Sequence, residues 1–432
     1  MQYFSTNNIS PTVNFKDATV NGQAPDKGLY FPEKIPSLTS EFIKNIEQFS
    51  NEAIAYEVIK PYTGNSIPDG ILKNIVEETV NFPMPLVPIT EDIFSLELIH
   101  GPTLAFKDVG ARFMSRCLGY FVKENPKKVV VLVATSGDTG GAVANGFYGV
   151  PNVDVIILYP SGKVSTVQEK QLTTPGKNIH ALEVNGSFDD CQQMVKEIFS
   201  NAAQFPDIFL TSANSINVAR WLPQQFYYFF ACKQWTYKSG LPVISVPSGN
   251  FGNICAGLLA QASGLQVKHF IAACNANDVV PEFLKTNNYT PKKAVATISN
   301  AMDVGNPSNF VRILEIFNKE TDALKNKLSA FSISEAQTID TLKKVYRQYR
   351  YLLDPHGAVG YHALEEYLQA YPTQKGIVIE TAHPVKFFDV VEPIIEEQIK
   401  IPIAIDEQLK LEKKSVLMEN NAEALKEFLL KI

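Results

Sequence analysis

The stretch "KKVVVLVATSGDTGGAVANGFYG", residues 127–149, determines the fold class. A run of apolar β-branched residues typical of a buried strand leads into a glycine-rich turn, and small residues that suit a helix follow. The same order recurs in "LPVISVPSGNFGNICAGLLAQASG". Further strands are predicted within residues 153–160, 177–205, 267–275 and 375–384. Strands that alternate with helices predict an α/β protein with parallel sheets covered on both faces.

Composition excludes several classes of protein. The chain has 432 residues, enough for more than one domain, and its 45% hydrophobic and 19% charged residues indicate a globular protein. The net charge is −6 and no basic stripe is visible, which argues against a nucleic-acid partner. No apolar run approaches the ~20 residues of a membrane helix. The start "MQYFSTNNIS" lacks the features of a signal peptide, so we expect a cytoplasmic protein.

The cysteines and histidines give no sign of a metal site. The five cysteines are an odd number with no CxxC pair, and the six histidines form no HExxH motif. This pattern predicts neither a disulfide framework nor a bound metal. If the protein catalyses demanding chemistry, an organic cofactor is favoured.

The two ends of the chain differ from its middle. "GQAPDKGLYFPEKIPSL", residues 22–38, suits turns, and helices are predicted at 39–50 and 68–82. The last twelve residues, 421–432, have the apolar spacing of an amphipathic helix. We therefore predict an N-terminal domain over 1–80, a core over 81–395 and a C-terminal helical segment over 396–432.

The first glycine-rich turn, "ATSGDTGG", offers a site for an anion. Thr135 and Ser136 carry hydroxyls, and Gly137 lets a ligand approach the backbone. Exposed N–H groups at the start of the following helix favour a negative charge such as a carboxylate. The alternative is a simple helix cap with glycines for tight packing.

The second turn, "PSGNFGN", suits a phosphate. Gly249, Asn250, Phe251, Gly252 and Asn253 lie between a predicted strand and helix, where amides and the helix dipole favour an anion. The turn is neither a Walker loop nor GxGxxG. An ordinary strand–helix connection is the alternative.

Lys107 stands in a largely small and apolar run, "GPTLAFKDVG". It is either a surface lysine with its stem along apolar neighbours or a partly buried amine used as nucleophile or base. Asp108 beside it suits a helix cap or a partner of the lysine region.

Taken together, "HGPTLAFKD", "ATSGDTGG", "PSGNFGN" and "ETAHP" resemble the threonine synthase family, in the microbial branch with an N-terminal extension. "APDKGLYFP" at 24–32 and "DPHGAVG" at 354–360 extend the resemblance nearly end to end. It implies a tryptophan-synthase-β-like core of pyridoxal-phosphate fold type II, with parallel sheets in two lobes. It also implies conversion of O-phospho-L-homoserine and water into L-threonine and phosphate, the last step of threonine biosynthesis.

The resemblance assigns residues to the cofactor, pyridoxal 5′-phosphate (PLP). Lys107 matches the lysine that forms a Schiff base and then carries protons. Residues 249–253 match the cradle of the cofactor phosphate. Asp138 stands where many relatives place an asparagine near the 3′-hydroxyl, and Thr381 matches the contact to the pyridine nitrogen.

For the substrate, the resemblance places the carboxylate on Thr135, Ser136 and Gly137. The substrate phosphate requires cations, and we expect Arg112 and Lys163 to supply them. Asn214 and Arg220, in "SANSINVAR", are further candidates, whereas His356 is expected to be structural. The expected assembly is a monomer or homodimer.

Three other functions are compatible with such a core. They are a serine/threonine dehydratase or cysteine synthase, a phospho-amino-acid lyase without synthase activity, and a non-catalytic binding protein. The segment 24–32 and "HGPTLAFKD" favour threonine synthase over the first. Lys107, the second turn and Thr381 together argue against the last.

Overall fold

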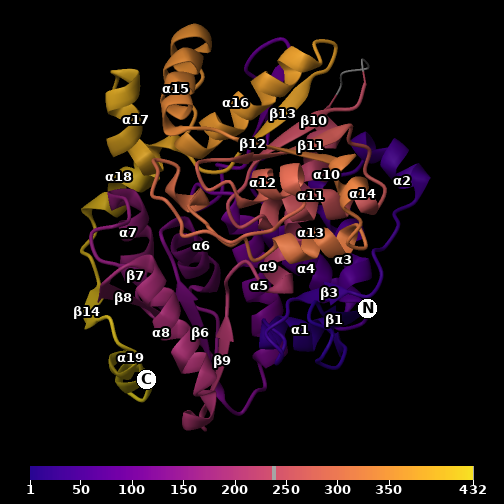
Figure 1. The fold of residues 1–432 in the computed structure, drawn as a ribbon. Coiled ribbons are helices and arrows are strands. Elements are labelled where there is room, and N and C mark those ends of the chain that lie inside the picture. The colour runs from indigo at the N-terminus through magenta and orange to yellow at the C-terminus, as the bar shows by residue number, and fades with distance from the viewer. Residues whose placement is uncertain (236–239, 432) are drawn as a thin grey trace.

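The computed structural model describes residues 1–235 and 240–431, which form two lobes built on parallel sheets (Figure 1). The six-stranded sheet lies above the five-stranded sheet in this view, and the N-terminal elements lie to one side. The upper sheet has the order β12 (Leu328–Ser332), β11 (His269–Cys274), β10 (Val243–Pro247), β13 (Gly376–Glu380), β5 (Ile93–Glu97) and β4 (Leu86–Pro88). All neighbouring strands in it are parallel except β4 and β5.

The lower sheet is parallel throughout. Its order is β14 (Ser415–Glu419), β8 (Ile179–Asn185), β7 (Val153–Pro160), β6 (Lys128–Ala134) and β9 (Ile208–Ser212). Every residue of β7 is buried, because helices cover both faces of the central strands. This explains why the sequence of β7 is an almost continuous apolar run.

The N-terminal segment forms a small antiparallel sheet of its own. Its strands are β2 (Val13–Asn14), β1 (Gln2–Ser5) and β3 (Tyr30–Pro32). The helices that follow it in the chain include α3 (Asn51–Thr63), which packs on α10 (Gln225–Gln234). The segment therefore joins the same continuous apolar core as the lobes.

The remaining α-helices connect the strands. They are α1 (Phe15–Asn21), α2 (Ser40–Lys44), α4 (Asp69–Thr79), α5 (Lys107–Val122), α6 (Asp138–Phe147), α7 (Thr166–Thr173), α8 (Phe188–Ser200), α9 (Val218–Trp221), α11 (Gly252–Ala262), α12 (Val279–Thr286), α13 (Phe310–Ile316), α14 (Thr321–Lys325), α15 (Glu335–Tyr349), α16 (Pro355–Ala370), α17 (Phe388–Ile395), α18 (Ile403–Lys410) and α19 (Ala422–Leu429). The short 3₁₀ helices are η1 (Ile46–Gln48), η2 (Ala202–Gln204), η3 (Leu222–Gln224), η4 (Asn300–Met302) and η5 (Pro384–Phe387).

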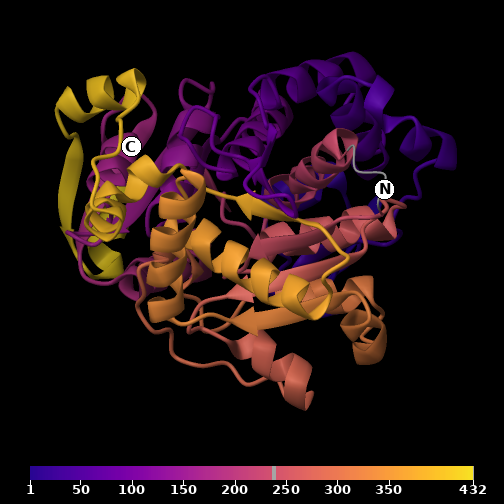
Figure 2. The same cartoon turned by 90° about the horizontal axis from the view of Figure 1, so that it is seen from above.

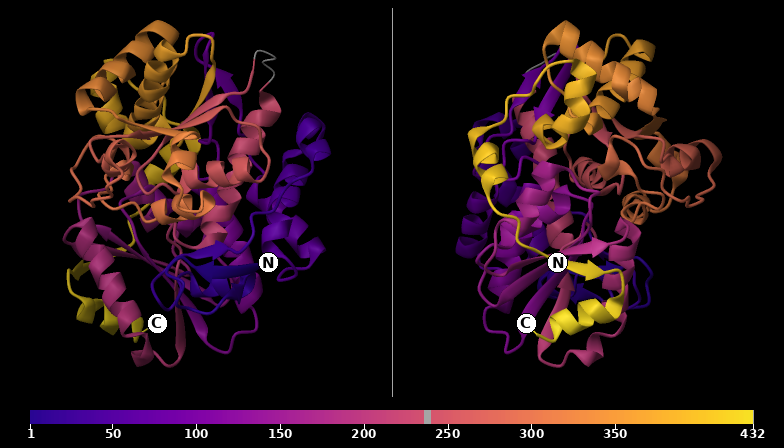
Figure 3. Two further views of the ribbon diagram at one scale, coloured as in Figure 1. Left: turned by 45° about the vertical axis from the view of Figure 1, so that its right-hand side comes forward. Right: turned by 90° about the vertical axis from the view of Figure 1, so that its left-hand side faces the viewer.

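The C-terminal segment contains more than the predicted helices. It runs from the upper lobe to the lower lobe along one side of the molecule (Figure 3) and lies beside the five-stranded lobe (Figure 2). There it adds β14 to the edge of the sheet, parallel to β8. Val416 and Leu417 of this strand remain exposed, so its sequence shows little of the alternation that marks a half-buried strand.

One predicted helix is interrupted. The expected helix over 39–50 ends at Lys44 and continues as η1. No helix among the described residues has the length and apolar character needed to cross a bilayer.

Candidate active site

The carboxyl ends of strands from both sheets supply the turns around Lys107. The turn after β6 carries residues 135–137, that after β10 carries 248–251, and that after β9 carries 213–217. Thr381 directly follows β13. Ligands of open α/β sheets bind at such carboxyl ends, so this is where a site is expected.

Lys107 is the first residue of α5, and the loop before it pairs with the segment after β13. Ala105 and Ala382 form an antiparallel bridge. The Phe106 N–H donates to the Thr381 carbonyl at 2.9 Å, and the His383 N–H donates to the Leu104 carbonyl at 2.9 Å. This pairing holds the Thr381 backbone next to the lysine loop, although the two segments are far apart in the chain.

The Lys107 amine is partly buried and available for reaction. Its Nζ lies 5.6 Å from the centre of the Phe106 ring, and among the described residues it has no hydrogen bond or ion pair. Burial lowers the pKa of this amine; Asp138 opposes the shift, whereas Lys386 and Arg220 add to it. A larger share of neutral amine is therefore present near neutral pH than for an exposed lysine.

Asp138 opens α6 and is almost fully buried. Its Oδ1 accepts hydrogen bonds from Lys386 Nζ at 2.8 Å and from Gln168 Nε2 at 2.8 Å. Burial alone would raise the pKa of Asp138, but the charges of Lys386 and Lys107 and these hydrogen bonds hold it well below its usual value. The carboxylate is thus ionised in the interior.

The loop of residues 249–253 presents its backbone to a ligand. None of its five N–H groups has a protein acceptor within the described ranges. Phe251 takes the left-handed conformation, with φ of 60°, at the start of α11. Two side-chain contacts fix the loop: Asn250 Nδ2 donates to Ser215 Oγ at 2.7 Å, and the Ser308 N–H donates to Asn250 Oδ1 at 2.6 Å.

Close packing behind this loop leaves no room for a side chain at position 249 unless the backbone shifts. A Cβ there would lie 2.6 Å from Met302 Cα. The free amides at the start of α11, on a tightly packed loop, suit a phosphate group.

The turn after β6 differs in detail from its predicted role. The Thr135 hydroxyl accepts from the N–H groups of Gly137 and Gly140 at 3.0 and 2.9 Å, so it shapes the turn itself. Gly137 has φ of 144°, and a Cβ there would lie 2.5 Å from the Gln168 side chain. Ser136 is partly exposed and, in the part of the chain that is described, its hydroxyl has no partner.

Of the two predicted phosphate-binding cations, Arg112 is bound to another part of the chain and Lys163 is exposed. The Arg112 guanidinium donates to the Glu78 carbonyl at 2.6 and 3.0 Å and so holds the end of α4. Lys163 is exposed in the turn after β7, and its charge acts on Asp190 at the start of α8. Sequence position alone could not show these surroundings of the two side chains.

Arg220 is a buried cation whose charge acts on Lys107. Its Nη1 donates to the Ala213 carbonyl at 2.6 Å, while its buried Nε has no partner and no carboxylate pairs with it in the described ranges. Burial lowers the pKa of Arg220 to about 10, so it remains cationic at neutral pH. Asn214 lies in the turn just before it and is partly exposed.

Two further polar residues brace the site. Asp108 accepts from the Thr103 N–H at 2.9 Å and from the Thr103 hydroxyl at 2.5 Å, which closes the lysine loop. His356 Nε2 accepts from the Ala301 N–H at 3.2 Å, and its Nδ1 contacts Asp354. Both residues are therefore structural.

Comparison with known proteins agrees with this geometry. Three family models match: "Threonine synthase N terminus" over residues 2–80, "Pyridoxal-phosphate dependent enzyme" over 84–380 and "Threonine synthase, C-terminal" over 357–429. A threonine synthase of Haemophilus influenzae is 42% identical over the full length of both chains. The chain belongs to the threonine synthase family.

Solved structures of this family share the fold over the whole chain. Threonine synthase from Escherichia coli superposes with a TM-score of 0.93 at 40% identity and covers 100% of both chains. PLP-bound threonine synthase from Brucella melitensis gives 0.92 at 34% identity, covering 99% of this chain and 98% of its own. As a threonine synthase, the protein is a PLP-dependent lyase of threonine biosynthesis.

Sequence reasoning missed Lys386 and Gln168 in this threonine synthase. Lys386 lies in "HPVKFF", an apolar run, which is the same signal that singled out Lys107. Gln168 had no comparable signal, because its contact with Asp138 depends on how α7 packs on α6.

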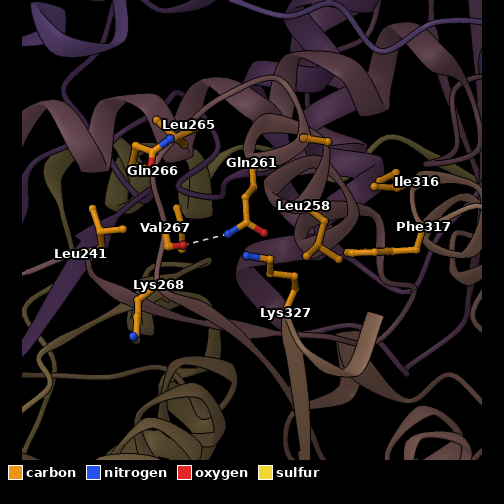
Figure 4. A pocket seen from close by; sticks show the side chains of 11 residues that line it. Leu241, Leu258, Gln261, Leu265, Gln266, Val267, Lys268, Ile316, Phe317 and Lys327 are labelled. Carbon is orange, nitrogen blue, oxygen red and sulfur yellow. Dashed lines mark hydrogen bonds between the residues drawn. The ribbon is translucent and has the colours of Figure 1, made fainter. Parts of the chain in front are cut away.

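A separate hollow of about 490 Å³ lies elsewhere (Figure 4). Leu241, Val267 and Lys327, which help to line it, precede β10, β11 and β12, so it opens at the amino ends of these strands. The hollow is therefore distinct from the Lys107 site.

Proposed function

We propose that the chain converts O-phospho-L-homoserine and water into L-threonine and phosphate at the Lys107 site. The observation that carries this proposal is an amine that has no hydrogen-bond partner among the described residues, with the buried guanidinium of Arg220, which no described carboxylate pairs, nearby. A substrate with an amine, a carboxylate and a phosphate matches these groups.

The residues present fit PLP. We assign covalent attachment to Lys107, the cofactor phosphate to the free amides of 249–253, and contacts to the ring to Thr381 and Asp138. When bound, this cofactor supplies an electron sink for negative charge at the substrate Cα. The protein then has to place the substrate and move protons.

Lys107 is suited to moving those protons. Its lowered pKa makes the neutral amine accessible, so it can take a proton at Cα and return one later. The loop that carries it is fixed on one side by Asp108 and on the other by the bridge to Ala382. The amine is thus held in a defined place through successive transfers.

The substrate anions take two different positions in this proposal. The Ser136 hydroxyl and the amides at the start of α6 receive the carboxylate. Arg220, with the Asn214 side chain, receives the phosphate, because a buried cation that no carboxylate of the described ranges pairs favours a dianion. Arg112 and Lys163 have no part in it. That the protein is a monomer or homodimer, and that it resides in the cytoplasm, remain predictions.

Incubation of the PLP-loaded protein with O-phospho-L-homoserine tests the proposal. We expect threonine and inorganic phosphate in equal amounts, with no product from Lys107→Ala. Phosphate without threonine would instead indicate a lyase that lacks the hydration step, and no turnover would contradict the proposed substrate. Unphosphorylated homoserine, offered in parallel, should give almost no threonine, because hydroxide leaves poorly and Arg220 stays unpaired.

A further inference from the structure

Lys386 is a fully buried lysine, 0% exposed, in η5 just after Thr381. Its Nζ donates to Asp138 Oδ1 at 2.8 Å and to the Thr103 carbonyl at 2.7 Å. One of these acceptors opens α6 at the end of a lower-sheet strand, and the other lies in the loop that leads to Lys107. A single ammonium therefore joins the two lobes at the site.

Helix α7 reinforces both contacts. Gln168 Nε2 donates to the same Asp138 Oδ1 at 2.8 Å, and Gln171 Nε2 donates to the same Thr103 carbonyl at 3.1 Å. These two glutamines lie nearly one helical turn apart, on the same face of α7. Each acceptor of Lys386 is thus held by a second donor from the lower lobe.

We propose that Lys386 is a positioning residue: it fixes the Asp138 carboxylate beside Lys107 and fastens the lysine loop to the five-stranded lobe. The inference rests on the proposed function of Lys107. Lys386 itself is not assigned covalent chemistry, because its ammonium is already bonded to a carboxylate and a carbonyl.

The charges around Lys107 make this role measurable. Asp138 from α6 and Asp354 before α16 raise the pKa of Lys107, whereas Lys386 and Arg220 lower it; burial lowers it most. Loss of the Lys386 charge alone should therefore raise the pKa of Lys107. Loss of the Asp138 charge alone should lower it, because Lys386 then acts without its counter-ion.

The experiment follows the reaction of apo-protein with PLP as a function of pH. The rate of appearance of the yellow covalent form reports the neutral fraction of Lys107. We expect Lys386→Met to move the midpoint up by about one pH unit or more and Asp138→Asn to move it down. The double variant should lie between the two single variants and nearer to the wild type.

Two control variants and a fallback keep the test decisive. Lys386→Arg retains the charge and should keep the midpoint near that of the wild type, even if PLP binds less tightly. Lys163→Met removes an exposed lysine and should change nothing. Should Lys386→Met fail to fold, as judged by its melting curve, the double variant still decides the matter: its midpoint should lie above that of Asp138→Asn alone, and equal midpoints for these two variants would overturn the proposal.

A purely structural Lys386 would give lower melting temperatures with unchanged midpoints, and that result would overturn the proposal. Shifts of the same sign in Lys386→Met and Asp138→Asn would also overturn it. Because no substrate is present, the outcome is separable from the proposed function: expected midpoint shifts without threonine formation would leave the positioning role intact and reject the reaction.

Discussion

Replacement of Gly249 by alanine probes the phosphate cradle with a single added methyl group. The added Cβ would lie 2.6 Å from Met302 Cα and 3.1 Å from the Ala301 carbonyl oxygen, against an optimum of about 3.5–4.0 Å between carbons. The neighbours are backbone atoms, and His356 holds the Ala301 N–H, so the 249–253 loop has to move instead.

Overpacking of this kind costs about 1–3 kcal/mol. In the free protein the loop can relax away from Met302, and cofactor binding then has to restore it. We therefore expect the dissociation constant for PLP to rise about 5- to 150-fold. The φ of Gly249 is not positive, so the contact alone is responsible.

Titration of apo-protein with PLP, followed by absorbance, measures this effect. Gly70→Ala is the matched control, because a Cβ there meets nothing within 4 Å and Gly70 is exposed at the start of α4. Its affinity should equal that of the wild type. An unchanged affinity in Gly249→Ala would refute the assignment of this loop to the cofactor phosphate.

Other perturbations have equally specific outcomes. Lys107→Ala should lose the yellow covalent form and nearly all turnover, and near-native kcat would reject its role. Arg220→Gln should raise the KM for phosphohomoserine at least tenfold, about 1.4 kcal/mol, with PLP absorbance unchanged. A KM equal to that of the wild type would show that the substrate phosphate binds elsewhere. Lys163→Ala should leave kcat and KM for phosphohomoserine within about twofold of the wild-type values in steady-state assays, since a surface charge contributes little. Burial holds the pKa values of His269 and His383 at about 4, so urea unfolding should show stability falling as pH drops from about 6.5 to 4, when the unfolded chain takes up protons. A flat profile would contradict this.

Much of the fold could be read from the sequence because its strands are buried on both faces. The apolar runs of β6, β7, β10 and β13 and the glycine turns after β6 and β10 are local signals, and the structure confirms them. Strand β14 could not be read in this way, because its pairing with β8 depends on a distant segment. The domain boundaries at residues 80 and 395 stay predictions.

In the site, too, local features can be predicted from the sequence and tertiary contacts cannot. Turns at strand ends identify backbone anion sites, and Lys107 was visible as a charge in an apolar run. The contacts of a long side chain depend on tertiary structure, so the sequence does not show that Arg112 binds the Glu78 carbonyl or that Lys386, in an equally apolar run, is fully buried.

The presence of two lysines, Lys107 and Lys386, in one site makes a direct test of the central claim possible. Borohydride reduction of the PLP-loaded protein fixes the cofactor on whichever amine holds it, and peptide mapping by mass spectrometry locates that residue. The Lys386 ammonium donates hydrogen bonds to two acceptors, whereas the Lys107 amine has none among the described residues. We therefore expect Lys107 to be the one modified residue, at close to one cofactor per chain. Modification of Lys386, or of any other lysine in place of Lys107, would contradict the account.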